Sequence, residues 1–191
     1  MDRSKLIRVS AAAALFLVCT APLAAQSADA APSPVMAALG RDVDTVEEKL
    51  LALAEALPEE TWGWRPADGV RSVGEVFMHI AADNYFIPTF AGVDAPAGSG
   101  IETRSYPSVQ AYEARQLSKA ETIAELRTSF DHLRQVMAGT SEASLGETLD
   151  LFGTETSTLD LWVLTTTHLH EHLGQMIAYA RSNDVAPPWS N

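Results

Sequence analysis

The sequence contains one cysteine, few basic residues and no apolar run long enough to cross a bilayer. Because Cys19 lies in a leader that we expect to be removed, the remaining chain has no disulfide, thiol nucleophile or thiolate ligand. The 13 basic residues face 25 acidic ones, and a net charge of −12 repels nucleic acid and anionic membranes. The longest apolar run, from Val9 to Cys19, falls short of the roughly 20 residues of a transmembrane helix. We therefore expect a soluble protein stabilised by its core, which binds neither nucleic acid nor, without the leader, a membrane.

The first 25 residues have the three-part pattern of a secretory signal peptide. A short cationic stretch precedes the apolar run, and small residues follow as far as Ala25. Cleavage after Ala30 is the alternative, because the residues ending there fit the small-x-small rule better. Residues 26–33 are rich in Ala, Ser and Pro and are expected to form a flexible leader. The pattern predicts export to the periplasm or the outside of the cell.

Four later segments carry apolar residues at steps of three and four, the period of an α-helix. Ser72 and Ser118 each stand three residues before a glutamate, and this capping-box spacing marks the start of a helix. The expected helices are Pro34–Ala56, Ser72–Phe90, Ser118–Met137 and Ser157–Arg181. Four long helices without a convincing strand pair predict an all-α fold, a four-helix bundle over residues 34–183.

The connections between these helices differ in length and composition. Residues 91–107 carry several glycines and prolines and predict a long connection, which is often functional. A short helix is expected at residues 108–116, and residues 139–156 form an extended or hairpin connection that we leave unassigned. Residues 184–191, with two prolines, are expected to form a C-terminal tail.

Three histidines are expected on inward helix faces. His168 and His172 are four residues apart, hence about 40° apart around the helix axis and about 6 Å along it, so one ion can take both. His79 lies beside apolar neighbours on another helix, where an unpaired ring would be costly to bury. Side chains of facing helices can converge on one ion, and three protein ligands leave a position for water or substrate. The pattern favours a metal site, with histidines that only hydrogen-bond as the structural alternative.

Three further side chains are candidates for supporting roles. Asp83 lies one turn beyond His79. Its carboxylate could accept a hydrogen bond from a metal-binding histidine or serve as a fourth metal ligand. Gln175 shares a face with His172 and could hydrogen-bond a ligand, although helix packing explains it equally well. Trp64 could form an aromatic wall over a pocket or a hydrophobic plug at the end of the bundle.

Two other histidines are expected outside the site. His170 lies about 200° from His168 around the helix, so it cannot share the same ion. His132 is near the polar side of its helix and is expected to be solvated. Because Leu169 stands three residues before His172, the segment also lacks the HExxH pattern of zinc proteases.

Three stretches of the chain resemble the DinB family. They are Trp64-Arg-Pro-Ala-Asp-Gly, Ser72-Val-Gly-Glu-Val-Phe-Met-His79-Ile-Ala and His168-Leu-His-Glu-His172-Leu-Gly-Gln175-Met-Ile-Ala-Tyr179-Ala-Arg181. Their order and spacing cover nearly the whole chain after the leader. The resemblance implies a four-helix bundle of the DinB/YfiT-like type, with one divalent ion on His79, His168 and His172. Imidazole ligands suit several ions, of which we expect Zn or Ni.

The resemblance also bears on function. The DinB family is similar to thiol-dependent enzymes such as bacillithiol S-transferases and mycothiol-dependent maleylpyruvate isomerase, whose metal activates a low-molecular-weight thiol. Those thiols are mainly cytosolic, whereas the signal peptide predicts export, so a thiol and water both stay open as the activated molecule. We expect a metal-dependent transferase or hydrolase with a small-molecule substrate, and a homodimer. The alternative is a bundle that binds a metal or small ligand without catalysis.

Overall fold

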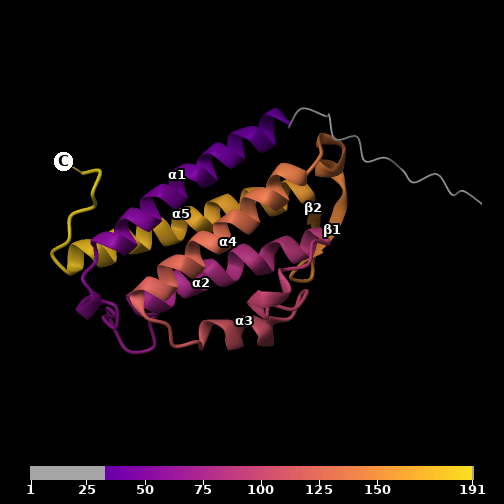
Figure 1. Ribbon diagram of the computed structural model, residues 1–191. Coiled ribbons are helices and arrows are strands. Elements are labelled where there is room, and N and C mark those ends of the chain that lie inside the picture. Colours follow the sequence, from indigo (N-terminus) through magenta and orange to yellow (C-terminus); the bar gives the residue numbers. More distant parts are fainter. Residues whose placement is uncertain (1–32, 191) are drawn as a thin grey trace, which may run out of the picture. The chain divides into compact units, whose positions relative to one another are not determined.

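The computed structural model describes residues 33–190 (Figure 1), so the predicted signal peptide lies outside the described residues. Four long helices form the body of the described chain. They are α1 (Pro34–Ala56), α2 (Val73–Phe86), α4 (Lys119–Gly139) and α5 (Thr158–Ser182). Helix α2 packs against α4 and α5, and α1 packs against the same two helices from the other side. The predicted four-helix bundle is confirmed.

Local sequence signals start three of these helices. Ser72 accepts a hydrogen bond from the backbone N–H of Glu75, and the Glu75 carboxylate accepts one from the Ser72 N–H at 2.7 Å. Ser118 opens α4 in the same way, so both predicted capping boxes are confirmed. Ser157 and Asp160 form a third box at the start of α5. Because each box satisfies backbone donors that the first helical turn leaves free, the helix starts agree closely with the sequence.

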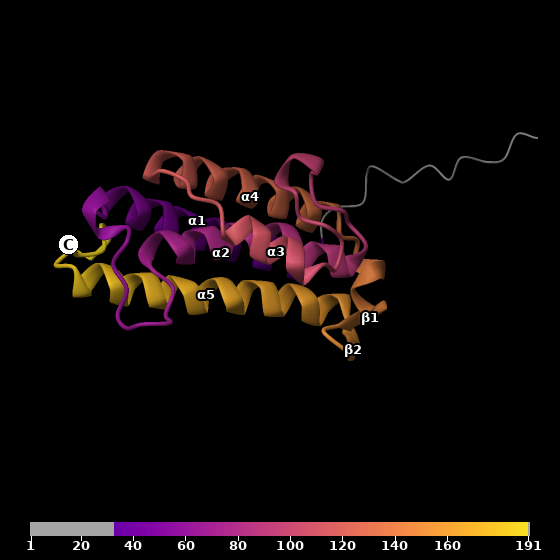
Figure 2. The ribbon, with the colours of Figure 1, turned by 90° about the horizontal axis from the view of Figure 1, so that it is seen from below.

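The second helix ends earlier than expected. Its α-helical part stops at Phe86, and the chain continues to Ala91 as a tighter turn, η2 (Ile87–Ala91). Pro88 explains the change, because proline has no N–H to continue the α-helical ladder. A short turn, η3 (Ala97–Ser99), and the helix α3 (Tyr106–Glu113) follow. Helix α3 lies beside α2 in both views (Figures 1 and 2), which brings the end of the long connection back to the bundle.

The segment left unassigned contains a hairpin. Its elements are the turn η4 (Glu142–Gly146) and the antiparallel strands β1 (Thr148–Leu151) and β2 (Thr154–Ser157). Phe152 and Gly153 connect the strands with φ angles of 54° and 85°, as a two-residue turn of type I′ requires. The Phe152 ring is exposed but lies 4.7 Å from the Phe90 ring between centroids, so the hairpin packs on η2, just beyond the end of α2.

The core consists of apolar side chains from all four long helices. Phe77, Phe130 and Trp162 are fully buried, and each such side chain contributes about 1.5–3 kcal/mol by its removal from water. One polar contact crosses this core, because the Asn84 amide donates to the Ser129 hydroxyl at 3.0 Å. Within residues 33–190, no helix is both long and apolar enough to span a membrane.

Candidate metal centre

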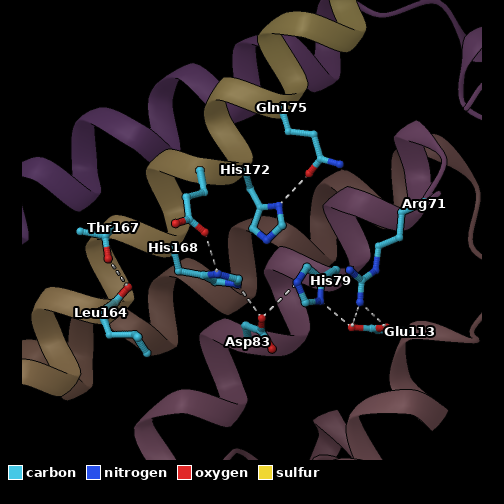
Figure 3. Close-up of polar contacts among 10 residues, drawn as sticks. Arg71, His79, Asp83, Glu113, Leu164, Thr167, His168, His172 and Gln175 are labelled. Carbon is cyan, nitrogen blue, oxygen red and sulfur yellow. Dashed lines mark hydrogen bonds and ion pairs between the residues drawn. The ribbon is translucent and has the colours of Figure 1, made fainter. Parts of the chain in front are cut away.

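The three predicted histidines converge at the contact between α2 and α5. Helix α2 contributes His79, and α5 contributes His168 and His172. One ligand atom from each ring lies within 4.8 Å of those of the other two. The ring centroids are 4.4 Å apart for His168 and His172, 4.7 Å for His79 and His172, and 5.4 Å for His79 and His168. The rings of this histidine cluster point toward one another (Figure 3), so together they could hold a metal ion.

Helix packing places the cluster at the edge of the core. On α5, Leu169 and Leu173 are buried one residue after each histidine, which turns the imidazoles toward the rim of the α2 contact. The side chains of His79 and His168 stay 13% and 25% exposed. Each ring is therefore fixed by packing and still reaches solvent, as a site for a small molecule requires.

A chain of hydrogen bonds fixes the proton on His172. The Tyr179 hydroxyl donates to the backbone carbonyl of Arg71 at 3.1 Å, so its oxygen is free to accept from the Gln175 amide at 3.0 Å. With its NH₂ group used in this way, Gln175 presents Oε1 to His172 Nδ1 at 2.8 Å. Because a carbonyl oxygen only accepts, Nδ1 carries the proton and Nε2 carries the lone pair. Gln175, a predicted candidate, thus orients a histidine.

The Nε2 atom of His172 indicates whether the site suits a metal ion. It is buried and has no hydrogen-bond partner among the described residues. Burial, more than any other cause, lowers the pKa of His172 to about 4, so the ring is neutral near pH 7. A buried acceptor without a partner costs about 1–3 kcal/mol. A cation bound to this lone pair would satisfy it, and the donor set therefore fits a metal ion.

His79 is held by a residue that sequence analysis did not identify. Its Nδ1 lies 2.6 Å from Oε1 of Glu113, and because a carboxylate only accepts, Nδ1 is the donor. Glu113 also faces Arg71 at 3.4 Å and 3.5 Å. Burial raises the pKa of Glu113, but the hydrogen bond from His79 and the charge of Arg71 outweigh it, and the pKa is lowered. Glu113 is thus a carboxylate that turns Nε2 of His79 toward the cluster.

Asp83 contacts two histidines of the cluster. Its Oδ2 lies 2.7 Å from Nε2 of His168 and 3.3 Å from Nε2 of His79. The other ring nitrogen of His168 is 4.0 Å from the exposed carboxylate of Glu171. The contacts of Asp83 are therefore on the Nε2 side of both rings, opposite to the side that Glu113 occupies on His79.

The predicted candidate Trp64 lies further out. Its ring meets the Tyr179 ring edge-on at 5.2 Å between centroids, and therefore supports the hydrogen-bond chain to His172. The neighbouring Trp62 stacks on Phe77 at 5.5 Å. Both rings pack against the core, which agrees with the interpretation of Trp64 as a hydrophobic plug at the end of the bundle.

The two remaining histidines have different environments. His170 lies outside the cluster, as expected, and its exposed ring contacts Asp42 at 2.9 Å. The expectation that His132 is solvated is wrong. Its ring packs 5.5 Å from the Tyr85 ring, its Nε2 is buried, and burial lowers its pKa. The apolar stripe of α4 is wider than its periodicity indicated, because α2 covers the His132 position as well.

Comparisons with known proteins agree with this geometry. The family model of the DinB superfamily matches residues 42–176, well over half of the chain. A comparison with curated proteins found no match. Among solved structures, a DinB-like protein from Bacillus cereus ATCC 10987 has a TM-score of 0.64 at 18% identity, covering 80% of this chain and 95% of its own.

Two solved structures from Bacillus subtilis have the same fold. A DinB-like protein matches with a TM-score of 0.58 at 16% identity, covering 77% of this chain and 92% of its own. YfiT, described as a probable metal-dependent hydrolase with an unusual four-helix bundle topology, matches with a TM-score of 0.62 at 14% identity. That match covers 83% of this chain and 93% of YfiT. The DinB/YfiT-like bundle, the three-histidine cluster and the family model together identify this chain as a member of the DinB superfamily.

Proposed function

We propose that this protein is a metal-dependent enzyme that activates water or a thiol on a divalent ion held by His79, His168 and His172. The observation that carries the proposal is the buried Nε2 lone pair of His172, which has no partner and faces the other two rings. Such a nitrogen is costly in a core unless a cation or a hydrogen-bond donor binds it. Zn or Ni suits a site of neutral imidazoles.

Each residue of the site has a role that follows from its contacts. His79, His168 and His172 bind the ion, while Glu113 and Gln175 accept the Nδ1 protons of two rings and fix their orientation. When bound, the ion lowers the pKa of a water or thiol and so supplies a nucleophile near neutral pH. Burial keeps His172 neutral and ready to bind the ion without loss of a proton.

Two observations support a small-molecule substrate. A cavity of about 360 Å³ is lined by Arg71 and Glu113, which adjoin the cluster, and by Tyr106 and Gln110 of α3. A pocket of this size is within the usual range for small ligands. The lining carries cations and carboxylates together, Arg65 and Arg71 beside Glu75 and Glu113, and would favour a substrate with polar groups.

Hydrolysis and thiol transfer differ in the molecule that the ion activates. The similarity to YfiT, a probable metal-dependent hydrolase, favours water. The thiol-dependent relatives implied by the sequence motifs favour a thiol. The signal-peptide pattern predicts an exported protein. Export favours water as the activated molecule, because the thiols of those relatives are mainly cytosolic.

Activity of metal-free and metal-loaded protein tests the proposal. Protein stripped with a chelator and reloaded with Zn or Ni should be assayed on ester, amide and thiol-transfer substrates, beside a His79→Ala, His168→Ala, His172→Ala triple variant. His170→Ala is the matched control, since it removes a histidine of the same helix that lies outside the cluster. Activity should follow the metal in wild type and control. Equal turnover with and without metal would refute the mechanism.

The alternative function is metal or small-ligand binding without turnover. Asp83 favours it, because a carboxylate that filled the last position of a four-coordinate ion would leave no place for a substrate. The same assays separate the two functions. A protein that binds metal with the three histidines but turns over none of the substrates in any metal form would be a binding protein.

A further inference from the structure

Asp83 approaches the histidines on the side that faces the cluster. Residues that support a metal site from outside bind the ring nitrogen that the metal does not use. Glu113 and Gln175 do so, because both contact Nδ1 atoms. Asp83 instead contacts Nε2 of His79 and Nε2 of His168. These nitrogens lie on the inner side of the rings, the side to which Nε2 of His172 also points (Figure 3).

The distances of Asp83 agree with a position inside the metal shell. With bonds of about 2.0–2.1 Å, two ligand atoms of a tetrahedral ion are roughly 3.3–3.4 Å apart. Oδ2 of Asp83 is already 3.3 Å from Nε2 of His79. Its 2.7 Å contact to Nε2 of His168 is a hydrogen bond, which would lengthen when the proton between the two atoms is replaced by the ion. Relative to these two nitrogens only a small movement of the carboxylate is needed, while the three histidine ligand atoms, which lie within 4.8 Å of one another, must also close around the ion.

We propose that Oδ2 of Asp83 is a fourth protein ligand, so that three imidazoles and one carboxylate hold the ion. This inference rests on the proposed function, since it concerns the same ion. In Figure 3 the side chains of His172, His168, His79 and Asp83 surround one point. Asp83 is one helical turn from His79, so the rigid backbone of α2 presents both ligands to that point.

The fourth ligand changes what the site can do. A carboxylate lowers the net charge of a divalent centre from +2 to +1, which strengthens ion binding. A substrate or water then occupies a fifth position, as ions such as Ni accept and as Zn accepts in expanded shells. Four protein ligands therefore favour ions that accept five or more ligands. Catalysis requires this larger coordination shell, because only then does a position remain for substrate or water.

The position of the ion tests the proposal directly. A crystal structure of the full chain loaded with Zn, and one loaded with Ni, would locate the ion relative to Asp83. We expect an Oδ2-to-metal distance of about 2.0–2.2 Å. An ion bound by all three histidines with Asp83 more than about 3 Å away would overturn the proposal but leave the proposed function intact. Absence of any ion at the cluster after loading would refute the proposed function itself.

Metal affinity and spectra in solution give an independent test. Asp83→Ala should raise the Zn dissociation constant by more than about 100-fold, beyond the usual effect of an outer partner, and should shift the visible bands of the Co(II)-loaded protein. Asp83→Asn keeps an oxygen donor and should have an intermediate effect. Glu113→Gln should weaken binding without moving the bands, because the only cluster atom that Glu113 contacts is Nδ1 of His79.

A matched control is available in the contact between Asp42 and His170, which lies outside the cluster. Asp42→Ala removes the carboxylate that faces His170 at 2.9 Å outside the cluster, and it should change neither the affinity nor the spectrum. Circular dichroism of each variant establishes that it is folded. An Asp83→Ala variant that is folded, binds Zn as tightly as wild type and has an unchanged Co(II) spectrum would overturn the proposal.

Discussion

Helix α5 makes two Asp–His contacts through histidines that are only two residues apart, and the contacts differ in burial and in the residues around them. His168 meets Asp83 at 2.7 Å with side chains 25% and 15% exposed. His170 meets Asp42 at 2.9 Å with side chains 50% and 42% exposed. The first contact belongs to a cluster with two more histidines, whereas the second is isolated on the outer face. A candidate site is distinguished from a surface contact by the burial of its side chains and by the other histidines that lie around it, rather than by the Asp–His contact itself.

The largest expected difference between the cluster histidines of α5 and the exposed His170 is in metal binding. His172→Ala should raise the Zn dissociation constant at least about 100-fold, because it removes a ligand whose lone pair the core already orients. His170→Ala should leave the constant unchanged, because its ring lies on the outer face. Competition with a chromophoric chelator measures both constants. Equal loss of affinity in the two variants would contradict the distinction.

A smaller effect is expected from the orientation of His172. Gln175→Leu removes the acceptor of the Nδ1 proton and should weaken Zn binding by about 10–100-fold, the usual effect of losing an outer partner. Glu171→Gln is the control, because its carboxylate is 78% exposed and 4.0 Å from His168. The same competition assay applies. Unchanged affinity in Gln175→Leu would mean that the hydrogen-bond chain does not select the tautomer.

The burial of His172 should also make the stability of the metal-free protein depend on pH. The pKa of His172 is about 4 in the folded chain against 6.5 when unperturbed, mainly because of burial. Above pH 6.5 the ring is neutral in both states. As the pH falls from 6.5 toward 4, only the unfolded chain takes up the proton, so the free energy of unfolding decreases.

This loss of stability should total about 2 kcal/mol after allowance for the partial exposure of the ring. Urea unfolding of metal-free protein at several pH values measures it. His172→Phe should reduce the slope over this range, whereas His170→Ala should retain it, because the His170 ring is exposed and lies outside the cluster. The same slope in wild type and His172→Phe would exclude His172 as its source.

The smallest effect is expected from the outer contact. Asp42→Ala should change the free energy of unfolding by less than about 0.5 kcal/mol, because exposed ion pairs contribute little. The measurement is urea unfolding at neutral pH in low and high salt. A loss above about 1 kcal/mol would mean that the His170–Asp42 contact is more than a surface pair.

The sequence predicted the features that depend on local rules. Ser72 and Ser118 marked helix starts because capping boxes act within one turn. The spacing of His168 and His172 predicted their common face because helix geometry is constant. The apolar neighbours of His79, and then the family motifs, indicated it as the third member, and the structure brings all three together. Asp83 was a candidate because it lies one turn beyond His79.

Features that depend on the path of the connections could not be predicted. Glu113 reaches His79 only because α3 folds back along α2, and no local pattern encodes that contact. Arg71 contributes its backbone carbonyl, which every residue possesses, and a side-chain contact to Glu113 that depends on the same fold-back of α3. The burial of His132 likewise depends on how α2 covers α4. A long connection rich in glycine and proline was the only signal that this region contributes to the site.

Metal content of the protein is the most direct test of the central claim that His79, His168 and His172 bind one ion. Elemental mass spectrometry should be performed on protein purified without a histidine tag and reconstituted with Zn or Ni, beside the triple alanine variant. We predict about one equivalent of metal in wild type and none in the variant. No metal in wild type, or equal metal in both proteins, would show that these three histidines do not bind the ion.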